Sequence, residues 1–493
     1  MESKKEFFTS RLTFIISLIS IAIGAGNIWR FSRVVAQNGG GSFLIPWAIF
    51  LFLWSLPLII TELAMGKLTR KAPIGAMAHT AGPNFGWMGA FIVLVTTSIL
   101  FYYSIVVGWG FRYFFFSISG KLVQTKDFTQ HWDTYTHTLM PFMFHCIITL
   151  IGAYVIYQGI TKGIEKITKV LIPILLVMII SIAVRAVTLP GASAGIAYLF
   201  TPHLSDLLNY KIWIEALTQN AWDTGAGWGL LLVYANYARN KERIVSNGFL
   251  TALTNNGVSL LMGVIIFGTA FAFDNDVSSL ISGDGSSNTG LTFIYLPSLF
   301  TSLPGGPILQ SLFAAIFFLA FGLGALCSMF SMVEVAVKSL SELGLSRKQA
   351  ICITTALSLC LGAPSAISMA VFENQDWVWS LGLIVNGLFI AFGVIRYGVN
   401  RFRVDAINTT DGDRKVGRIY NFIIRYIIPF QGITLLSWYL YQGVIQFQGG
   451  HWWSPFHVYS VGSLLFQWGI GITFFVLCNK WIVKKTLSDT VNI

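Results

Sequence analysis

The sequence has few charged residues: Asp, Glu, Lys and Arg make up only 11% of its 493 positions. It also has only five cysteines, and all five fall inside hydrophobic stretches. Outer loops without cysteines cannot form disulfides, so we expect no disulfide bond. The N-terminus is short and charged and leads directly into a long apolar stretch, so we expect no cleavable signal peptide. We also expect no low-complexity tract and no soluble domain.

Motifs for catalysis and nucleotide binding are missing as well. The run from Gly39 to Ser42 lacks the lysine and the spacing of a phosphate-binding loop. The seven histidines lie mostly in or near the expected outer connections and have no metal-ligand spacing. No Ser/His/Asp or Cys/His set forms a nucleophile motif. These absences argue against an enzyme and against an organic cofactor.

Hydrophobic residues are abundant instead, at 55% of the chain, and apolar runs of twenty or more residues recur along its length. This pattern predicts an all-α polytopic membrane protein that crosses the lipid bilayer twelve times. The expected segments are roughly 11–36, 41–66, 86–117, 139–158, 164–187, 211–238, 241–273, 307–340, 348–371, 377–397, 418–444 and 456–483. Of the longer outer connections, we expect 274–306 to fold over a vestibule and 188–210 to be a plain solvated loop.

The basic residues predict the orientation of the chain. If the segments alternate, the basic clusters all fall on one side, which the positive-inside rule assigns to the cytoplasm. We therefore expect a multi-pass protein of the cell inner membrane with both termini in the cytoplasm, and no nucleic-acid partner despite the net charge of +11. The clustered residues are Lys4, Lys5, Arg11, Lys67, Arg70, Lys71, Lys162, Lys166, Lys169, Arg239, Lys241, Arg243, Arg347, Lys348, Arg401, Arg403, Arg414, Lys415, Arg418, Lys480, Lys484 and Lys485.

Two apolar segments are interrupted by glycines, at 23–27 in the first and at 223–229 in the sixth. Opened backbone is costly in hydrocarbon and is tolerated only where it lines a protein-enclosed cavity. Paired breaks in the two halves of a chain are typical of the binding site of a secondary transporter. N–H groups freed at such a break attract an anion, whereas freed carbonyls of Ser20, Ala22 and Ile23 suit a hard cation.

Three of the acidic residues within apolar segments are candidates for a role of their own. Asp223 is near the middle of the sixth, which makes it a candidate functional residue; the alternative is a structural acid paired with a polar neighbouring helix. Asn255 and Asn256, halfway along the seventh segment, are placed to complete a polar cluster. For Glu62 and Glu334 we expect a structural role in which each accepts backbone N–H groups from an unwound helix.

At these residues the chain resembles the neurotransmitter:sodium symporter family, in its bacterial amino-acid branch. The resemblance spans the full length and is densest in 11–12, 24–31 (Gly-Ala-Gly-Asn-Ile-Trp-Arg-Phe), 38–43, 62–66, 159–166, 234–237 and 346–348. It implies two five-helix inverted repeats, about 11–187 and 211–397, followed by two extra helices at about 418–483, all in one transporter domain. It also implies inward transport of an amino acid or amine with sodium by alternating access, by a monomer or homodimer.

The same resemblance implies binding residues. The substrate would meet Ala22, Ala25, Gly26, Leu100, Tyr103, Trp222, Gly225, Trp228, Ser328 and Met332. One sodium ion would use Ala22, Asn27, Asp223 and Asn255, and a second would use Ser20, Ile23, Gly324, Cys327 and Ser328. The expected gate residues are Lys5, Arg30, Tyr237, Glu342 and Asp376. Arg30 and Asp376 lie near the outer ends of their segments, where an ion pair between them would close a vestibule.

Three departures from the family pattern refine the expectation. Gly24 stands where amine carriers have an aspartate, which favours a zwitterionic substrate. Asp223 stands where the family usually has a hydroxyl, close to the position at which animal relatives hold chloride, and Ser259 matches a chloride-contacting residue. The fixed negative charge of Asp223 would then make bound chloride unnecessary. Cys327 replaces a hydroxyl at the second sodium site, and a neutral thiol is a poor ligand for a hard cation.

The leading hypothesis is therefore sodium-coupled symport of a neutral, hydrophobic or aromatic L-amino acid, independent of chloride. The alternative within transporters is proton or mixed-cation coupling, with Asp223 titrating in place of a sodium ion. A channel would need a continuous polar pore, against which the sparse charges argue. A non-transporting receptor stays open at this point, because only flux distinguishes it from a transporter.

Overall fold

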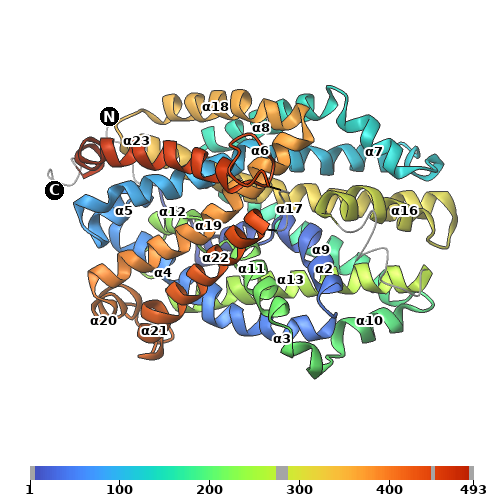
Figure 1. Cartoon of the computed structure of the whole chain (residues 1–493), viewed down its shortest axis with the longest axis horizontal. Helices are drawn as coiled ribbons and strands as arrows, with labels where there is room; N and C mark the ends of the chain where they lie inside the picture. The colour runs from blue at the N-terminus through green and yellow to red at the C-terminus, as the bar shows by residue number, and fades with distance from the viewer. Residues whose placement is uncertain (1–5, 274–286, 446–449, 488–493) are drawn as a thin grey trace.

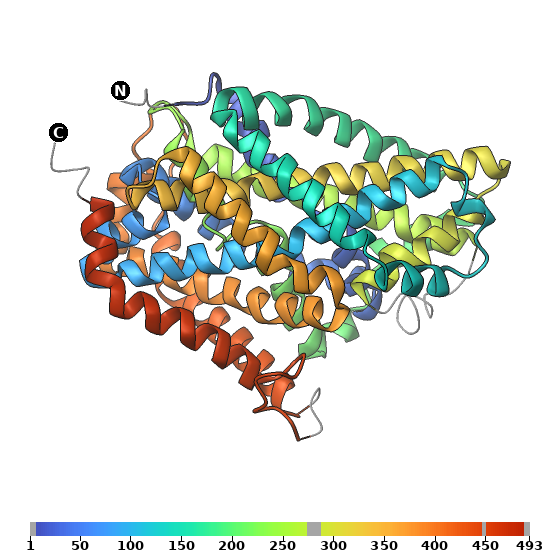
Figure 2. The ribbon, with the colours of Figure 1, turned by 90° about the horizontal axis from the view of Figure 1, so that it is seen from above.

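The computed structural model describes residues 6–273, 287–445 and 450–487, and within these ranges the chain forms helices and loops without a strand. The helices run side by side in an elongated bundle (Figure 1). The first and last described residues lie at one end of this bundle, and the short helices α7 (Phe128–Thr136), α10 (Ala192–Phe200) and α16 (Leu296–Thr301) lie at the other. Seen from above, α23 (Val461–Leu487) follows one outer edge (Figure 2).

Among the described residues, ten helical stretches are long and apolar enough to cross a membrane, and a bent pair makes an eleventh. The continuous ones are Gly41–Thr69 (α3, η2 and α4), Pro83–Ile118 (η3 and α6), Met140–Tyr157 (α8), Ile160–Val187 (η5 and α9), Ile244–Phe273 (α13), Gly306–Glu342 (α17), Arg347–Ile367 (α18), Met369–Tyr397 (α19), Ile419–Ile445 (α21, η10 and α22) and Val461–Leu487 (α23). The all-helical membrane fold predicted from the sequence is thus confirmed.

The two remaining segments are the broken ones. In the first, α1 (Arg11–Ala22) and the stretch Gly26–Gln37 (η1 and α2) are bent by 43°. In the sixth, α11 (Tyr210–Asp223) and α12 (Leu230–Asn236) are separated by the non-helical residues 224–229. Both breaks fall where the glycines predicted them. Each half of the sixth segment is too short to span a bilayer alone, because a span needs roughly 20 helical residues.

The connection 188–210 is not the plain loop that we expected. It contains α10 (Ala192–Phe200) and the 3-10 helix η6 (Leu204–Leu208). Small residues explain the difference, because they let helices pack closely: a Cβ on Gly195 would collide with the carbonyl oxygen of Phe267 on α13. The Ala and Gly residues of α10 are typical of a loop in composition, but in the structure they allow a close contact between two helices.

Two other connections at the same end are also structured. The described part of 274–306 forms α15 (Asn288–Gly290), η8 (Leu291–Tyr295) and α16 (Leu296–Thr301), and residues 274–286 lie outside the described residues. The helix α7 (Phe128–Thr136) was not predicted. Its Trp132 ring stacks on Phe293 of η8 with centroids 4.9 Å apart, so aromatic packing joins the two connections over the bundle.

Three short elements lie at the opposite end. The helix α5 (Pro73–Thr80) follows α4, and α20 (Val399–Phe402) and η9 (Arg403–Ile407) follow α19, whereas η4 (Leu122–Gln124) lies beside α7. α5 packs beside the end of α23, where the Nζ of Lys71 donates to the carbonyl oxygen of Thr486 at 2.9 Å. The two longest helices, α6 and α17, cross inside the bundle at a glycine pair, since a Cβ on Gly110 would lie 3.1 Å from Cα of Gly322.

Candidate functional site

The two helix breaks lie against each other in the middle of the bundle. A Cβ added to Gly26 would lie 3.3 Å from Cβ of Asp223, the last residue of α11. On the other side of the break, a Cβ on Gly225 would lie 3.1 Å from Ile21. Gly225, like two glycines after it, has a positive φ (74°), a conformation that L-residues rarely adopt. The glycines therefore allow both the opened backbone and the close approach of the two breaks.

The opened segment after α11 is held by side chains from neighbouring helices. The backbone N–H of Gly227 donates to Oε1 of Glu62 at 2.6 Å, and the hydroxyl of Thr96 donates to the carbonyl oxygen of Trp228 at 2.6 Å. Glu62 is fully buried on α4. Its predicted role as an acceptor for unwound backbone is confirmed.

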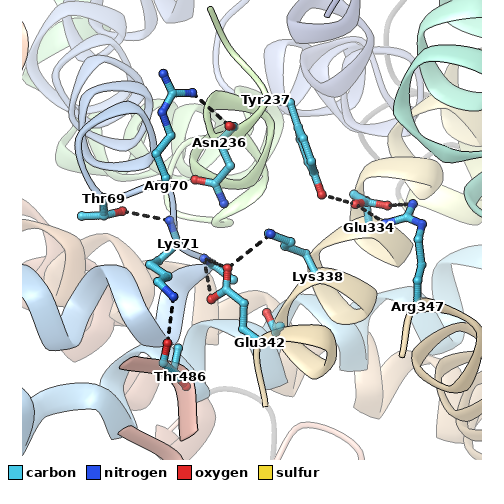
Figure 3. A network of polar contacts seen from close by, with 12 residues as sticks. Thr69, Arg70, Lys71, Asn236, Tyr237, Glu334, Lys338, Glu342, Arg347 and Thr486 are labelled. Atoms are coloured by element: carbon cyan, nitrogen blue, oxygen red, sulfur yellow. Dashed lines mark hydrogen bonds and ion pairs between the residues drawn. The ribbon is translucent and has the colours of Figure 1, made fainter. Parts of the chain in front are cut away.

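Glu334 was predicted to have the same role, and that prediction is wrong. Its carboxylate accepts from the hydroxyl of Tyr237 at 2.6 Å and forms an ion pair with Arg347 at 2.7 Å. Arg347 begins the next helix, α18, so the turn between α17 and α18 brings the two charges together. Glu334 is thus part of a side-chain network (Figure 3). The network lies toward the end of the bundle where the described chain starts and finishes, which the basic clusters predict to face the cytoplasm and which we call the inner end.

A small cavity opens between the two breaks. Eight of the ten residues predicted to bind substrate line it; Ala25 and Leu100 do not, although both are buried close by. The full lining is Ile21, Ala22, Gly24, Gly26, Tyr103, Trp222, Asp223, Gly225, Trp228, Leu230, Ser328 and Met332. The hydroxyl of Tyr103 accepts from the N–H of Ala25 at 3.1 Å. The cavity therefore combines a polar floor at the break of α1 with apolar and aromatic walls.

Polar groups gather beside this cavity around Asp223. The amide nitrogen of Asn27 donates to Oδ1 of Asn255 at 2.9 Å and to the hydroxyl of Ser259 at 2.8 Å. The same terminal atom of the Asn255 amide lies 2.8 Å from the carbonyl oxygen of Ala22 and 3.0 Å from that of Asp223, to both of which a nitrogen in this position would donate. Oδ2 of Asp223 accepts from Gln219 at 3.1 Å, and Oδ1 has no hydrogen-bond partner within the described part of the chain. The four residues predicted for the first sodium site therefore meet in one buried cluster.

A second group of oxygens lies at the end of α1. The hydroxyl of Ser328 on α17 is within 3.2–3.4 Å of the carbonyl oxygens of Ser20, Ile21 and Ile23. Gly324 lies one turn away, and a Cβ there would be 3.6 Å from the oxygen of Ile23. These carbonyls are available because the helix ends at Ala22. Cys327 is fully buried next to this group.

On the side of the break away from the inner end, which is the predicted outer side, lies a larger cavity of ≈ 180 Å³. Trp222 lines both this cavity and the small one, so its side chain forms part of the wall between them. Arg30 and Asp376 both line the outer cavity, but Arg30 pairs with Glu215 at 3.6 Å and bonds to Gln219 at 3.4 Å. The predicted contact between Arg30 and Asp376 is therefore not made in this conformation.

Glu215 and Gln219 were missed in the sequence, although a signal was present. They precede Asp223 at intervals of four residues, so α11 carries a polar stripe along one face. Arg30 turns toward this stripe because Glu215 offers a charge on the adjacent helix. Asp376 instead contacts the hydroxyl of Ser380 on its own helix, at 3.4 Å.

On the inner side, the segment before α1 is hydrogen-bonded to two different parts of the chain. The N–H of Phe8 donates to the carbonyl oxygen of Tyr237 at 3.1 Å, and the N–H of Thr9 donates to Glu165 at 3.0 Å. Residues 6–10, which we call the N-terminal strap, thus lie between the end of α12 and the start of α9. Lys5, a predicted gate residue, lies outside the described residues.

Glu342, another predicted gate residue, holds the start of α5. Both carboxylate oxygens accept from the N–H of Ala72 at 2.9 Å, and Lys338 lies 3.6 Å away (Figure 3). Tyr237 and Glu342 are therefore two parts of one inner network that joins α12, α17, α18 and α5. Lys338 and Arg347 belong to it as well and were not predicted.

Comparison with known proteins gives consistent matches. The model of the sodium:neurotransmitter symporter family matches residues 5–140 and 137–489. A sodium-dependent transporter of Methanocaldococcus jannaschii, MJ1319, is 32% identical over 73% of this chain and 74% of its own. The sodium-dependent serotonin transporter of Drosophila melanogaster is 27% identical over 98% of this chain and 83% of its own. The solved structure of MhsT in complex with L-phenylalanine is 27% identical, covers 88% of this chain and 99% of MhsT, and has a TM-score of 0.77.

Proposed function

Because the chain belongs to the sodium:neurotransmitter symporter family, we propose that it imports a neutral, hydrophobic or aromatic L-amino acid together with sodium. Its relatives are transporters and not enzymes. The observation that carries the proposal is the meeting of the two helix breaks, which puts freed N–H groups, carbonyl oxygens and a buried carboxylate around one cavity. A zwitterion and a cation are the partners that such a set of groups complements.

The polar floor supports an amino acid as substrate. The start of η1 at Gly26 attracts a carboxylate through its free N–H groups, and the hydroxyl of Tyr103 lies beside it. A Cβ on Gly24 would be 2.9 Å from Ser328 and 3.1 Å from the Tyr103 hydroxyl. A side chain at position 24 would crowd Ser328 and Tyr103, and glycine leaves the site without a carboxylate there, which favours a substrate that supplies its own.

The walls of the cavity favour a substrate with an apolar side chain. Trp222 and Trp228 stand edge to face with ring centroids 5.9 Å apart, and Met332 and Leu230 complete the apolar part of the lining. Aromatic and thioether side chains favour aromatic ligands. The phenylalanine complex of MhsT is consistent with this class of substrate.

The cluster around Asp223 is suited to bind the first sodium ion. Hard cations prefer carboxylate, carbonyl and amide oxygens. The Asn255 amide faces two carbonyl oxygens: with its nitrogen turned to them it donates a hydrogen bond, and with its oxygen turned to them it completes a cation site. Asp223 and Asn27 supply further oxygens. We propose that sodium selects the second orientation of Asn255.

A second sodium ion would use the carbonyl oxygens of Ser20 and Ile23 and the hydroxyl of Ser328. Ile21 offers an additional carbonyl oxygen that the sequence comparison did not assign. The thiol of Cys327 is a weak ligand for a hard cation, so oxygen atoms alone would define this site. Transport would then alternate between closure on the outer side, by Arg30 with Glu215 or Asp376, and closure on the inner side by the network around Tyr237 and Glu342.

Uptake into vesicles tests the proposed function. Purified protein in liposomes with an inward sodium gradient should accumulate a neutral apolar or aromatic L-amino acid, because the ion gradient drives the shared cycle. Equal uptake in potassium would reject sodium coupling, and sodium dependence at fixed pH separates it from proton coupling through Asp223. Binding without accumulation of any amino acid would indicate a receptor.

Replacement of Tyr103 by Phe tests the carboxylate contact. The hydroxyl is expected to donate to the substrate carboxylate, and loss of one charge-assisted hydrogen bond costs roughly 1.5–3 kcal/mol. The dissociation constant should rise about tenfold to a hundredfold, with the thermal stability of the ligand-free protein nearly unchanged. An unaltered dissociation constant would remove Tyr103 from the binding site.

Replacement of Asp223 by Ser tests whether the protein carries its own negative charge. Sodium and a substrate ammonium bring two positive charges into a buried site, and the substrate carboxylate offsets only one of them. Wild-type transport should not change when gluconate replaces chloride. Asp223→Ser should be nearly inactive without chloride and partly recover when chloride is added. Chloride dependence of the wild type would contradict the assignment, and a variant without recovery would leave Asp223 as a cation ligand only.

A further inference from the structure

Arg70 has an unusual backbone conformation. It ends α4 with a φ of 53°, and it is the one non-glycine residue with positive φ in the ranges that the structure describes. This left-handed conformation commonly follows the last turn of a helix, where glycine is preferred because it has no Cβ. A bulky residue persists there when surrounding contacts over-determine the conformation. The contacts of the Arg70 side chain are therefore the place to look for a reason.

The guanidinium group binds the end of α12. Its Nη1 donates to the carbonyl oxygen of Asn236 at 2.9 Å (Figure 3). Nη1 also donates to the carbonyl oxygens of Ala235 at 3.3 Å and Ala238, and Nη2 donates to Oδ1 of Asn240 at 2.7 Å. The last carbonyls of a helix have no partner within the helix. Partial burial lowers the pKa of Arg70, yet an arginine stays charged at neutral pH. One fixed positive charge thus caps α12.

The same side chain reaches the N-terminal strap. The guanidinium carbon lies 5.8 Å from the ring centroid of Phe7, within the range of a cation–π contact. The next residue along the strap, Phe8, is bonded to the backbone of Tyr237. Arg70 therefore contacts both elements that close the inner side of the bundle, the strap and the end of α12.

The turn at Arg70 also directs the residues that follow it. Lys71 donates to Thr486 at the end of α23, and the N–H of Ala72 donates to Glu342 of the inner network. If the turn served only to direct the chain, glycine would satisfy it without strain. The arginine is explained by its side-chain contacts, which would be lost once the end of α12 moved away from α4.

We propose that Arg70 is a positioning residue of the inner gate, which holds the end of α12 and the N-terminal strap together while the site is closed to the cytoplasm. This role rests on the proposed alternating-access function and adds to it a residue outside the binding site. When the inner side opens, the guanidinium contacts break and the left-handed turn can relax. Arg70 thus biases the equilibrium toward the inward-closed state.

Arg70→Gly separates the two roles of the residue, because glycine suits the turn but lacks the guanidinium. The reporter is Ser17→Cys in a background whose five native cysteines are replaced by alanine, which adds no cation ligand at Cys327, and all variants are compared in this same background. Ser17 is fully buried, and its hydroxyl lies 3.2 Å from the hydroxyl of Thr168 where α1 packs against α9. In inside-out vesicles, Arg70→Gly should raise the labelling rate of this cysteine by an impermeant maleimide on the order of tenfold, with unchanged or higher thermal stability.

Two further variants complete the experiment. Arg70→Lys keeps the charge but not the forked geometry, so its labelling rate should lie between those of wild type and Arg70→Gly. Arg414→Gly is the matched control: it removes an exposed arginine that contacts the ring of Phe249 at 5.3 Å, away from the strap, and should label at the wild-type rate. Labelling of Arg70→Gly at the wild-type rate would overturn the proposal.

Failure of the Arg70 proposal can be distinguished from failure of the proposed transport function. If the wild type shows no sodium-driven uptake but Arg70→Gly still exposes the reporter, then Arg70 closes the inner side of a protein with another activity. If uptake is sodium-driven and the reporter is unaffected, only the role of Arg70 is wrong. A marked fall in thermal stability of Arg70→Gly would show that the arginine supports the fold as a whole and would likewise overturn the gating role.

Discussion

The central constraint on this structure is that backbone groups opened inside a membrane need partners. Each unsatisfied N–H or carbonyl group costs several kcal/mol in hydrocarbon, and both broken segments expose such groups. The surrounding helices supply part of the compensation. Glu62 and Thr96 bind the opened segment after α11, and Tyr103 and Asn27 bind N–H groups at the break of α1. The architecture around the breaks is organised to hold these side chains in place.

The groups that remain define the chemistry of the site. Carbonyl oxygens at the end of α1 face Ser328 and Asn255, and the Asp223 carboxylate is buried beside them. A buried carboxylate is costly unless a positive charge accompanies it. In the proposed function a sodium ion is that charge, and the substrate carboxylate lies next to it. Each ligand then lowers the cost of binding the other, which is the physical basis of coupled transport.

Much of the fold and of the site could be predicted, because residues that are unfavourable in a lipid bilayer are easily recognised within apolar segments. Gly24, Gly26 and Asp223 stood out because glycines and an acid are unfavourable in the middle of an apolar segment. The breaks followed from that contrast and the membrane-spanning helices from the apolar runs, whereas the predicted residues of the cavity lining came from the family resemblance. The assignment of individual sodium ligands and of the inverted repeats came from the family resemblance and stays a prediction.

The two wrong side-chain pairings share a cause, which is that pairing depends on how helices are rotated and connected. Arg30 pairs with Glu215 and not with Asp376, and Glu334 pairs with Arg347 across a helix turn; segment positions alone do not determine either choice. The helix α10 was missed because its small residues resemble loop composition. The left-handed turn at Arg70 is likewise invisible in the sequence, since glycine is the residue that normally marks such a turn.

Mutual dependence of sodium and amino-acid binding is the most direct consequence of a shared buried site. Equilibrium binding to the purified protein can measure the amino-acid dissociation constant at several sodium concentrations, and the sodium dissociation constant with and without amino acid. Binding free energies are linked, so each ligand should improve the affinity of the other by the same factor, on the order of tenfold or more. An amino-acid affinity that does not change when potassium replaces sodium would contradict the account.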